Sequence, residues 1–247
     1  MNGENPRTGL ILAAGFGTRL NGAQTATHIK ALVPLNGKPL ILHTLENLEK
    51  AGCGRVVVVV GWEAEKARQE IGEIYQGPME LFFAHNPRYE LQNGVSVLAG
   101  REYIETDFIL TMADHWFEEK IMKGICGHHP PESGATLCVD YKIDLIFDID
   151  DATKVLEQNG LIHAIGKDLS RFNCIDTGVF VCTGALFDAL ERVYRDRGDA
   201  SLSEGVQALA DRGKMAVLDI GDALWQDIDT PQMMSHAEAL LRNRNSP

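Results

Sequence analysis

The stretch Leu10-Ile11-Leu12-Ala13-Ala14-Gly15-Phe16-Gly17-Thr18-Arg19-Leu20 decides how the rest of the chain is interpreted. Its apolar first half predicts a buried strand, and the small residues that follow predict a tight turn at the strand's end. Because Gly15 and Gly17 carry no side chain, several backbone N–H groups of the turn can converge on an anion, and Arg19 adds a guanidinium. The alternative is an ordinary surface turn. The cations Arg19 and Lys30 favour phosphate binding.

Two common phosphate-binding loops do not fit this stretch. No Gly-Lys-Ser or Gly-Lys-Thr ending follows the glycines, and Leu20 stands where the dinucleotide-binding fingerprint has its third glycine. The loop therefore belongs to another class.

The composition indicates a globular, acidic protein. The chain has 247 residues, of which 45% are hydrophobic and 23% charged, and its formal net charge is -12. A chain of this size can bury a full core as one large α/β domain. The negative charge opposes binding to nucleic acid and to anionic membranes, so we expect neither as a partner.

No stretch of the sequence predicts export or membrane insertion. Residues 1–9 are polar and lack the apolar core of a signal peptide, and the valine run Val56–Val60 is too short to cross a bilayer. The five cysteines are an odd number without a Cys-x-x-Cys pair, which favours neither a disulfide framework nor a structural zinc site. We expect a cytoplasmic protein whose cysteines are small buried residues.

Strand and helix patterns alternate through the first half of the chain. Residues 55–60 form a β-branched run without polar alternation, which is typical of a parallel strand covered on both faces. Helical patterns occupy 39–51 and 64–74, and a further strand is expected at 81–84. We therefore expect an α/β fold with a Rossmann-like, doubly wound, mainly parallel sheet.

The pattern becomes antiparallel after Pro130. The runs 154–157 and 161–165 flank Gln158-Asn159-Gly160, which is a strong hairpin signal. Helices are expected near 184–195 and 203–211. This part of the chain predicts a second lobe with a mixed or antiparallel sheet.

Asn93, Gly94 and Ser96 follow the third predicted strand, where open α/β sheets place their ligands. Ser96 is expected to cap a short helix. An ordinary Asn-Gly turn is the alternative, and the position at a strand's end favours a binding site.

Two aspartates stand at the ends of predicted strands from opposite ends of the chain. Asp114 follows the apolar run 108–112, and its carboxylate suits Mg²⁺, unless it caps a helix that begins near Phe117. Asp227 occupies a similar position before Thr230-Pro231. We expect Asp229 on the opposite face of that segment, as a structural or turn residue.

These motifs resemble those of a known protein family. Leu12–Leu20 with Lys30 is similar to the Leu-Ala-Ala-Gly-x-Gly-Thr-Arg-Leu/Met…Pro-Lys signature of nucleotidylyltransferases that make CDP-, UDP- or dTDP-activated compounds, with Ile29 in place of the usual proline. The stretches 148–155, 165–169 and 176–178 look like those of inositol-1-phosphate cytidylyltransferases. The resemblance runs from about residue 10 to about residue 241.

This resemblance implies one nucleotidyltransferase domain over residues 1–247. Its nucleotide-binding half is expected at about 8–127 and its acceptor-binding half at about 128–230. A C-terminal helix follows at 231–243.

The resemblance also implies roles for individual residues. The expected catalytic residues are Arg19, Lys30, Asp114 and Asp227, with Mg²⁺ as cofactor on Asp114 and Asp227. The expected nucleotide contacts are Leu12, Ala13, Ala14, Gly15, Gly17, Thr18, Asn93, Gly94 and Ser96. The expected acceptor contacts are Lys154, Lys167, Asp176 and Thr177.

The implied reaction is transfer of CMP from CTP to an alcohol phosphate, with inositol 1-phosphate as the acceptor. The attacking phosphate monoester is mostly dianionic at pH 7, so no protein nucleophile or general base is required. The alternatives are a phosphocholine cytidylyltransferase, a sugar-1-phosphate nucleotidylyltransferase and, from another class, a non-catalytic nucleotide-sensing domain. The expected partners are CTP or another NTP, a phosphorylated small-molecule acceptor and a second copy of the chain in a possible homodimer.

Overall fold

The computed structural model describes residues 7–17, 20 and 29–244 of the chain. The predicted Thr18 and Arg19 lie outside these residues. The strands are β1 (Arg7–Ala13), β2 (Pro34–Leu35), β3 (Lys38–Pro39), β4 (Cys53–Val60), β5 (Glu80–His85), β6 (Phe108–Met112), β7 (His115–Phe117), β8 (Ala135–Asp140), β9 (Lys154–Gln158), β10 (Leu161–Gly166), β11 (Cys174–Cys182), β12 (Met215–Asp219) and β13 (Trp225–Asp227). The α-helices are α1 (Leu40–Lys50), α2 (Ala64–Ile74), α3 (Asn93–Ala99), α4 (Glu119–Ile125), α5 (Ala185–Arg197), α6 (Leu202–Ala210) and α7 (Pro231–Arg244). Short 3-10 helices occupy Lys30–Leu32, Arg101–Tyr103 and Ile143–Leu145.

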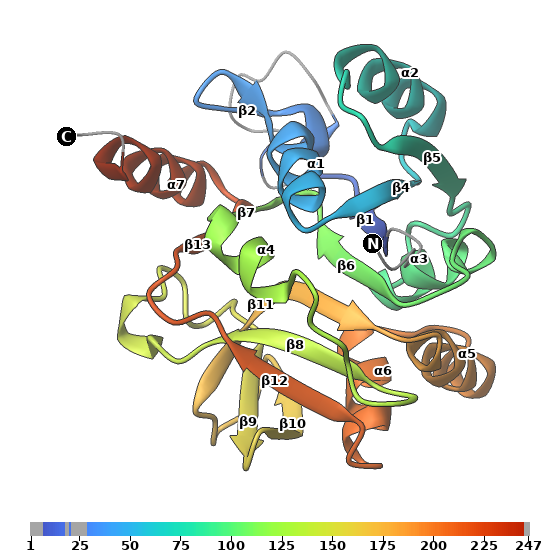
Figure 1. Ribbon diagram of the computed structural model, residues 1–247, viewed down its shortest axis with the longest axis vertical. Coiled ribbons are helices and arrows are strands. Elements are labelled where there is room, and N and C mark those ends of the chain that lie inside the picture. Colours follow the sequence, from blue (N-terminus) through green and yellow to red (C-terminus); the bar gives the residue numbers. More distant parts are fainter. Residues whose placement is uncertain (1–6, 18–19, 21–28, 245–247) are drawn as a thin grey trace.

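One sheet runs through the molecule in the order β5-β4-β1-β6-β11-β8-β12-β10-β9 (Figure 1). Strands β5, β4, β1 and β6 are parallel to one another, as the β-branched run in β4 predicts. The connections from β1 through β4 to β5 move outward in one direction, and the chain then returns to place β6 on the other side of β1. The carboxyl ends of β1 and β6 therefore flank a topological switch point, where open α/β sheets bind their ligands.

Alternate residues of the parallel strands face two separate cores. Leu10 and Leu12 of β1 pack in a core that includes α3, α5 and α6, whereas Ile11 packs in a core that includes α1, α2 and α4. Because successive side chains of a strand point to opposite faces, both faces are covered by helices. This confirms the doubly wound arrangement predicted for the first half.

The second half closes into a ring of five strands. The order β11-β8-β12-β10-β9 is joined end to end by a further pairing of β11 with β9. In this ring only β8 and β12 are parallel, and β11 also pairs antiparallel with β6. The first half is therefore parallel and the second half mixed, as predicted, and the two halves form one continuous sheet.

The hairpin predicted around Asn159 and Gly160 is confirmed. Strands β9 and β10 pair antiparallel, and Asn159 and Gly160 have φ values of 54° and 80°. Both central residues of the turn therefore adopt the left-handed backbone that favours Asn-Gly.

Three local expectations differ from the structure. Ser96 lies inside α3, whose N-cap is Gln92. Asp114 does not cap the helix expected near Phe117: α4 begins at Glu119 with Glu118 as its N-cap, because residues 115–117 form β7, which pairs antiparallel with β13. Four cysteines are buried as expected, but Cys126 is exposed.

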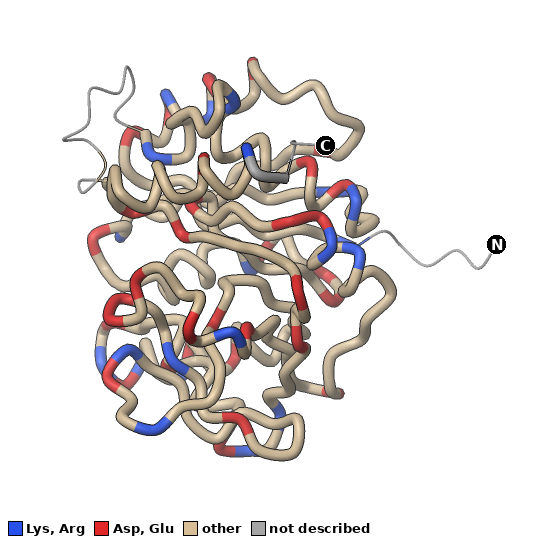
Figure 2. The backbone as a smooth tube through the Cα atoms, turned by 90° about the vertical axis from the view of Figure 1, so that its left-hand side faces the viewer, with Lys and Arg blue, Asp and Glu red and all other residues tan. Residues whose placement is uncertain are grey.

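Two further features of the described residues are the hydropathy of the helices and the distribution of charged residues. Among the residues that the structure describes, no helix is long and apolar enough to span a bilayer. Figure 2 shows the positions of Lys and Arg interspersed with those of Asp and Glu along the backbone of the described residues.

Candidate active site

A cavity of about 540 Å³ opens at the carboxyl ends of β1 and β6 and extends into the second half. Its walls come from both halves and from the segment around β13. Of the residues predicted from sequence, those that line it are Leu12, Ala14, Gly15, Asn93, Ser96, Asp114, Lys167, Asp176 and Asp227. The lining therefore joins most of the predicted residues in one space, although they span more than 200 positions of the chain.

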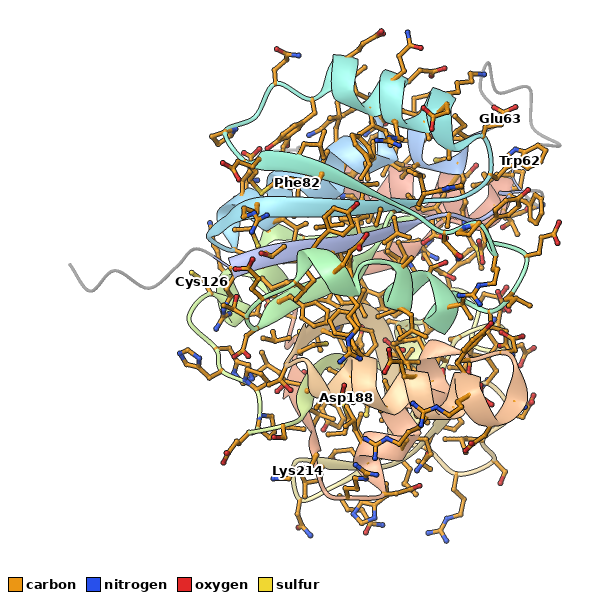
Figure 3. All side chains as sticks on the ribbon, turned by 90° about the vertical axis from the view of Figure 1, so that its right-hand side faces the viewer. Trp62, Glu63, Phe82, Cys126, Asp188 and Lys214 are labelled. Carbon is orange, nitrogen blue, oxygen red and sulfur yellow. The ribbon has the colours of Figure 1, made fainter. Side chains whose placement is uncertain are left out.

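The glycine-rich turn lies against neighbouring backbone and aromatic rings. Gly17 has φ +60°, and a Cβ there would lie 2.6 Å from the Cβ of Lys30. Phe16 packs against Trp62 and Tyr89, with ring centroids 5.2 Å from each. Figure 3 shows Trp62 at the opposite end of the strands from Cys126. These contacts fix the turn beside Lys30 at the edge of the cavity.

Lys30 lies between two carboxylates from distant parts of the chain. Its Nζ donates to Asp114 Oδ2 at 2.5 Å and also to Asp229 Oδ1. The Lys30 side chain is only 12% exposed. Burial by itself lowers the pKa of Lys30, but the charges of Asp114 and Asp229 outweigh it and raise the pKa. The lysine is therefore held as a cation.

Asp114 uses both carboxylate oxygens. Its Oδ1 lies 2.9 Å from Nδ1 of His115, while Oδ2 accepts from Lys30. Burial raises the pKa of Asp114, but the Lys30 ammonium and the hydrogen bond from His115 outweigh it, so the pKa is far below its usual range. Burial by itself lowers the pKa of His115, but its hydrogen bond to Asp114 and the charges of Asp114 and Asp227 outweigh it and raise the pKa.

Asp151, Asp227 and Asp229 form an acidic cluster, with one oxygen of each within 4.8 Å of the others. Asp229 was expected to face away from Asp227, and this was wrong. Residues two apart share a face of an extended segment, and here Ile228 between them is fully buried. The backbone N–H of Ile228 donates to Asp114 O at 2.8 Å, which brings Asp229 beside Lys30.

The donor set of this region suits a divalent ion with a preference for oxygen. Asp227 and Asp229 supply carboxylates, and Asp114 is joined to Asp229 through Lys30. Burial, together with the charges of Asp229 and Asp114, raises the pKa of Asp227 despite the opposing charge of His115. A cation in this region would remove that mutual repulsion.

The residues expected to contact the nucleotide base also hold the fold together. Asn93 Oδ1 accepts from the backbone N–H of Leu202 at 2.9 Å, and Ser96 Oγ accepts from Asn86 at 2.9 Å. A Cβ on Gly94 would lie 2.5 Å from the carbonyl oxygen of Ala200. Asn93 and Ser96 still line the cavity, whereas Gly94 serves close packing.

The four residues expected to contact the acceptor divide into two groups. Lys167 and Asp176 line the cavity, and Lys167 pairs with Asp151 at 2.5 Å. Lys154 donates to the carbonyl oxygens of Asp150, Ala152 and Lys167, and Thr177 donates to Cys138 O. Because Lys154 and Thr177 are buried with internal partners, the structure does not bring them to the cavity.

The carboxyl group of Asp176 has an unusual pKa. Its Oδ1 accepts from the backbone N–H of Gly178 at 2.7 Å. Burial nevertheless raises its pKa to about 6. The group can therefore exist with or without its proton near neutral pH.

Several cavity residues were not predicted from the sequence. His115 and Trp225 stack with ring centroids 6.0 Å apart, and Trp225 Nε1 donates to Asp140 at 2.9 Å. Tyr89 and Lys142 also line the cavity. The position of His115 directly after Asp114 was a usable signal, but no sequence pattern marks Tyr89, Asp140 or Lys142.

Comparison with known proteins shows what this chain is similar to. The model of the MobA-like NTP transferase domain matches residues 9–211. A bifunctional IPC transferase and DIPP synthase from Archaeoglobus fulgidus is 31% identical over 234 residues, which are 94% of this chain and 43% of that protein. A UTP–glucose-1-phosphate uridylyltransferase from Haloferax volcanii is 26% identical, over 96% of this chain and 97% of that protein. The chain spans about half the length of the bifunctional relatives it matches.

Comparison with solved structures also finds nucleotidyltransferases. The inositol-1-phosphate CTP transferase from T. maritima matches with a TM-score of 0.79 and 30% identity, over 95% of this chain and 97% of that one. A glucose-1-phosphate thymidylyltransferase structure from Bacillus anthracis matches with a TM-score of 0.83 at 18% identity, over 98% and 97% of the two chains, and supports the fold alone.

Proposed function

The chain belongs to the MobA-like NTP transferase family, and from that premise we propose that it transfers CMP from CTP to inositol 1-phosphate, with release of pyrophosphate. The observation that carries the proposal is the cavity itself. It joins a glycine-rich turn and the Lys30–Asp114–Asp229 group to Lys167, which pairs with Asp151 of the acidic cluster, and to Asp176. This arrangement supports a reaction in which the phosphates of both substrates meet beside the acidic cluster.

The reaction needs no covalent intermediate with the protein. A phosphate oxygen of the acceptor attacks the α-phosphorus of CTP, a new P–O bond forms, and the bond to the β-phosphate breaks to release pyrophosphate. The acceptor phosphate is mostly dianionic at pH 7, so its attacking oxygen carries no proton to remove. Catalysis then consists of positioning and of stabilising the charge that develops on the leaving group.

The residues around the turn are suited to the triphosphate. The backbone of residues 12–17 approaches the phosphates, and Arg19 and Lys30 stabilise the departing pyrophosphate. Asn93 and Ser96, which line the cavity, are the proposed contacts to the base. Asn93 Oδ1 is engaged with Leu202, so Asn93 would read the base through its amide N–H groups.

Asp114 and Asp227 remain the proposed magnesium ligands, and the geometry adds Asp229 to them. Bound Mg²⁺ would supply positive charge to the phosphate oxygens. The protein itself holds the carboxylates together and allows Lys30 to leave them and contact the phosphates.

Lys167 and Asp176 are the proposed acceptor contacts. Lys167 is a cation on the cavity wall, and Asp176 can accept hydrogen bonds from ring hydroxyls. A polyol phosphate satisfies both groups, whereas phosphocholine offers Asp176 no hydroxyl.

A pyrophosphate-release screen tests the function. CTP, UTP, dTTP, ATP and GTP are each combined with inositol 1-phosphate, phosphocholine and glucose 1-phosphate in the presence of Mg²⁺. We expect the highest kcat/KM for CTP with inositol 1-phosphate. Equal efficiency with phosphocholine contradicts the acceptor proposal, and no turnover with any pair contradicts the enzyme proposal in favour of a nucleotide-sensing domain.

A further inference from the structure

His115 has contacts that the reaction described above does not use. Its Nδ1 lies 2.9 Å from Asp114 Oδ1, and its side chain is 18% exposed. The residue pairs across the β7–β13 ladder with Asp227. His115 is therefore in contact with one proposed metal ligand and directly opposite another.

The imidazole ring is fixed from two sides by distant parts of the chain. Trp225 stacks on it with an interplanar angle of 7°, and the indole is itself held by its Nε1–H donating to the buried Asp140. On another side lies Gly178, where a Cβ would come within 3.0 Å of His115 Nε2 and where φ is +76°. A ring held in this way has one orientation, and that orientation aims Nδ1 at Asp114.

Lys30 and His115 divide the two oxygens of Asp114 between them. Lys30 holds Oδ2 and His115 holds Oδ1. During the proposed reaction Lys30 has to turn toward the nucleotide phosphates, so it cannot go on holding Asp114 as it does here. The contact with His115 does not conflict with phosphate binding, because it uses the other oxygen.

We propose that His115 is a positioning residue that keeps the Asp114 carboxylate aimed at the catalytic centre once Lys30 has moved to the nucleotide. The inference rests on the proposed function, since it needs Lys30 on the phosphates and Asp114 on the divalent ion. His115 acts through Asp114 and does not touch the reacting atoms. Its specific contribution is one hydrogen bond, donated from the Nδ1 position.

Substitution of His115 by Asn or by Gln distinguishes the hydrogen-bonding role from a role in packing alone. The amide nitrogen of Asn can reach the position of His Nδ1, whereas that of Gln reaches the position of Nε2. His115→Asn should therefore keep the bond to Asp114, and His115→Gln and His115→Ala should lose it. His163→Ala is the matched control, because that side chain is exposed on β10 and does not line the cavity.

Two measurements are made on the full chain, with each variant's melting temperature recorded. In steady-state assays with CTP and inositol 1-phosphate, His115→Ala and His115→Gln should lower kcat by about ten- to a hundredfold, the loss of one charge-assisted hydrogen bond. The KM for inositol 1-phosphate should change little. His115→Asn should recover most of the lost kcat, and His163→Ala should match the wild type.

The second measurement does not depend on turnover. Binding of Mn²⁺, alone and with the α,β-methylene analogue of CTP, is followed by electron paramagnetic resonance. The Ala and Gln variants should bind Mn²⁺ at least about fivefold more weakly than the wild type, and the Asn variant should bind it like the wild type. Equal Mn²⁺ affinity in all variants, or an Asn variant as impaired as Ala, overturns the role of His115. An inactive wild type whose Mn²⁺ affinity still follows this order contradicts the proposed reaction and leaves the role of His115 standing.

Discussion

At the scale of single residues, the ammonium group of Lys30 links the two ends of the chain. It is bound by Asp114 after β6 and by Asp229 after β13. Two carboxylates this close would repel each other without a cation between them. Lys30 therefore serves the folded state before any substrate binds.

Replacing Lys30 by Met tests this double role. We expect a lower melting temperature in EDTA, because Asp114 and Asp229 lose their shared counter-charge, and a partial recovery in Mg²⁺, which replaces it. Turnover should fall about ten- to a hundredfold, the loss of one charge-assisted contact in the transition state. Unchanged kinetics in Lys30→Met would assign the phosphate role to another cation, with Arg19 as the first candidate.

Asp176 gives a prediction about pH. Burial raises its folded-state pKa to about 6 from the usual 3.8, so the ionised carboxylate costs stability. That cost is absent below the unfolded pKa, grows between about pH 4 and 6, and is complete above about pH 6. Asp176→Asn should therefore raise the melting temperature at pH 7.5 by up to about 6 to 12 °C, since about two pKa units correspond to about 3 kcal/mol in a chain of this size.

Two measurements complete the test of Asp176. The stability difference between Asp176→Asn and the wild type should vanish at pH 4, where the wild-type carboxyl is protonated in the folded protein. The same variant should raise the KM for inositol 1-phosphate while the KM for CTP stays within about twofold. A gain in stability that persists at pH 4 would show that the wild-type charge is not its cause.

At the scale of elements, the β7–β13 ladder assembles the acidic end of the cavity. Asp227 is paired with His115 in the ladder, and the next backbone bond joins Ile228 to Asp114. Because side chains alternate along an extended segment, Asp227 and Asp229 lie on one side and the buried Ile228 lies on the other. A ladder of three residues on each side thus positions the proposed metal ligands.

Substitution of each ligand by Asn tests the ladder's role. Asp227→Asn and Asp229→Asn should each lower the affinity for Mn²⁺ by about tenfold or more and reduce turnover sharply while the fold is preserved. Asp222→Asn is the control, because that exposed residue pairs with Lys120 on the surface. Wild-type turnover in Mg²⁺ for Asp227→Asn would show that its assignment as a ligand is wrong.

Two lysines at the ends of the β9–β10 hairpin have different roles: Lys154 begins β9, and Lys167 directly follows β10. Lys154 is buried and donates to three backbone carbonyls, whereas Lys167 is about half exposed at the cavity wall. Lys154→Met should lower the melting temperature by several degrees, since buried acceptors lose their donor. The KM values should be unchanged.

Lys167→Ala should give the opposite result. Its pair with Asp151 is partly exposed and contributes about 0 to 1 kcal/mol to stability, so the melting temperature should hardly move. The KM for inositol 1-phosphate should rise at least about tenfold while that for CTP stays constant. A defect confined to CTP would rule out Lys167 as an acceptor contact.

At the scale of the whole molecule, the cavity has more negative than positive side chains. Seven aspartates and two lysines are among the described residues that line it, in a chain whose net charge is -12. Two phosphorylated substrates can enter such a space only if cations accompany them. Nucleotide binding is therefore expected to depend on a divalent ion.

Thermal unfolding in the presence of ligands tests this dependence. At a hundredfold excess over its dissociation constant, a ligand stabilises the folded state by about 2.7 kcal/mol, which corresponds to about 5 to 10 °C here. CTP with Mg²⁺ should produce a shift of this size, and CTP with EDTA should produce almost none. Equal shifts under both conditions would contradict the cation requirement.

The sequence by itself determined the elements and the position of the phosphate turn. The alternation of strands and helices before residue 128, the Asn-Gly hairpin and the Pro231 start of α7 follow from periodicity and from backbone preferences. These signals are local, since each is carried by residues within a few positions of one another. The motifs in the sequence also indicated the family that the comparisons identify.

Only the tertiary structure decided which polar groups share a partner. The closure of the ring by β9 and β11, the salt bridges of Lys30 and the inward direction of Lys154 join segments that no local pattern connects. A polar side chain has several acceptors or donors available in the unfolded chain, and packing selects among them when it excludes water. For this reason most of the residues named from the sequence lie at the cavity, while the fold supplied the rest of the lining and assigned the contacts.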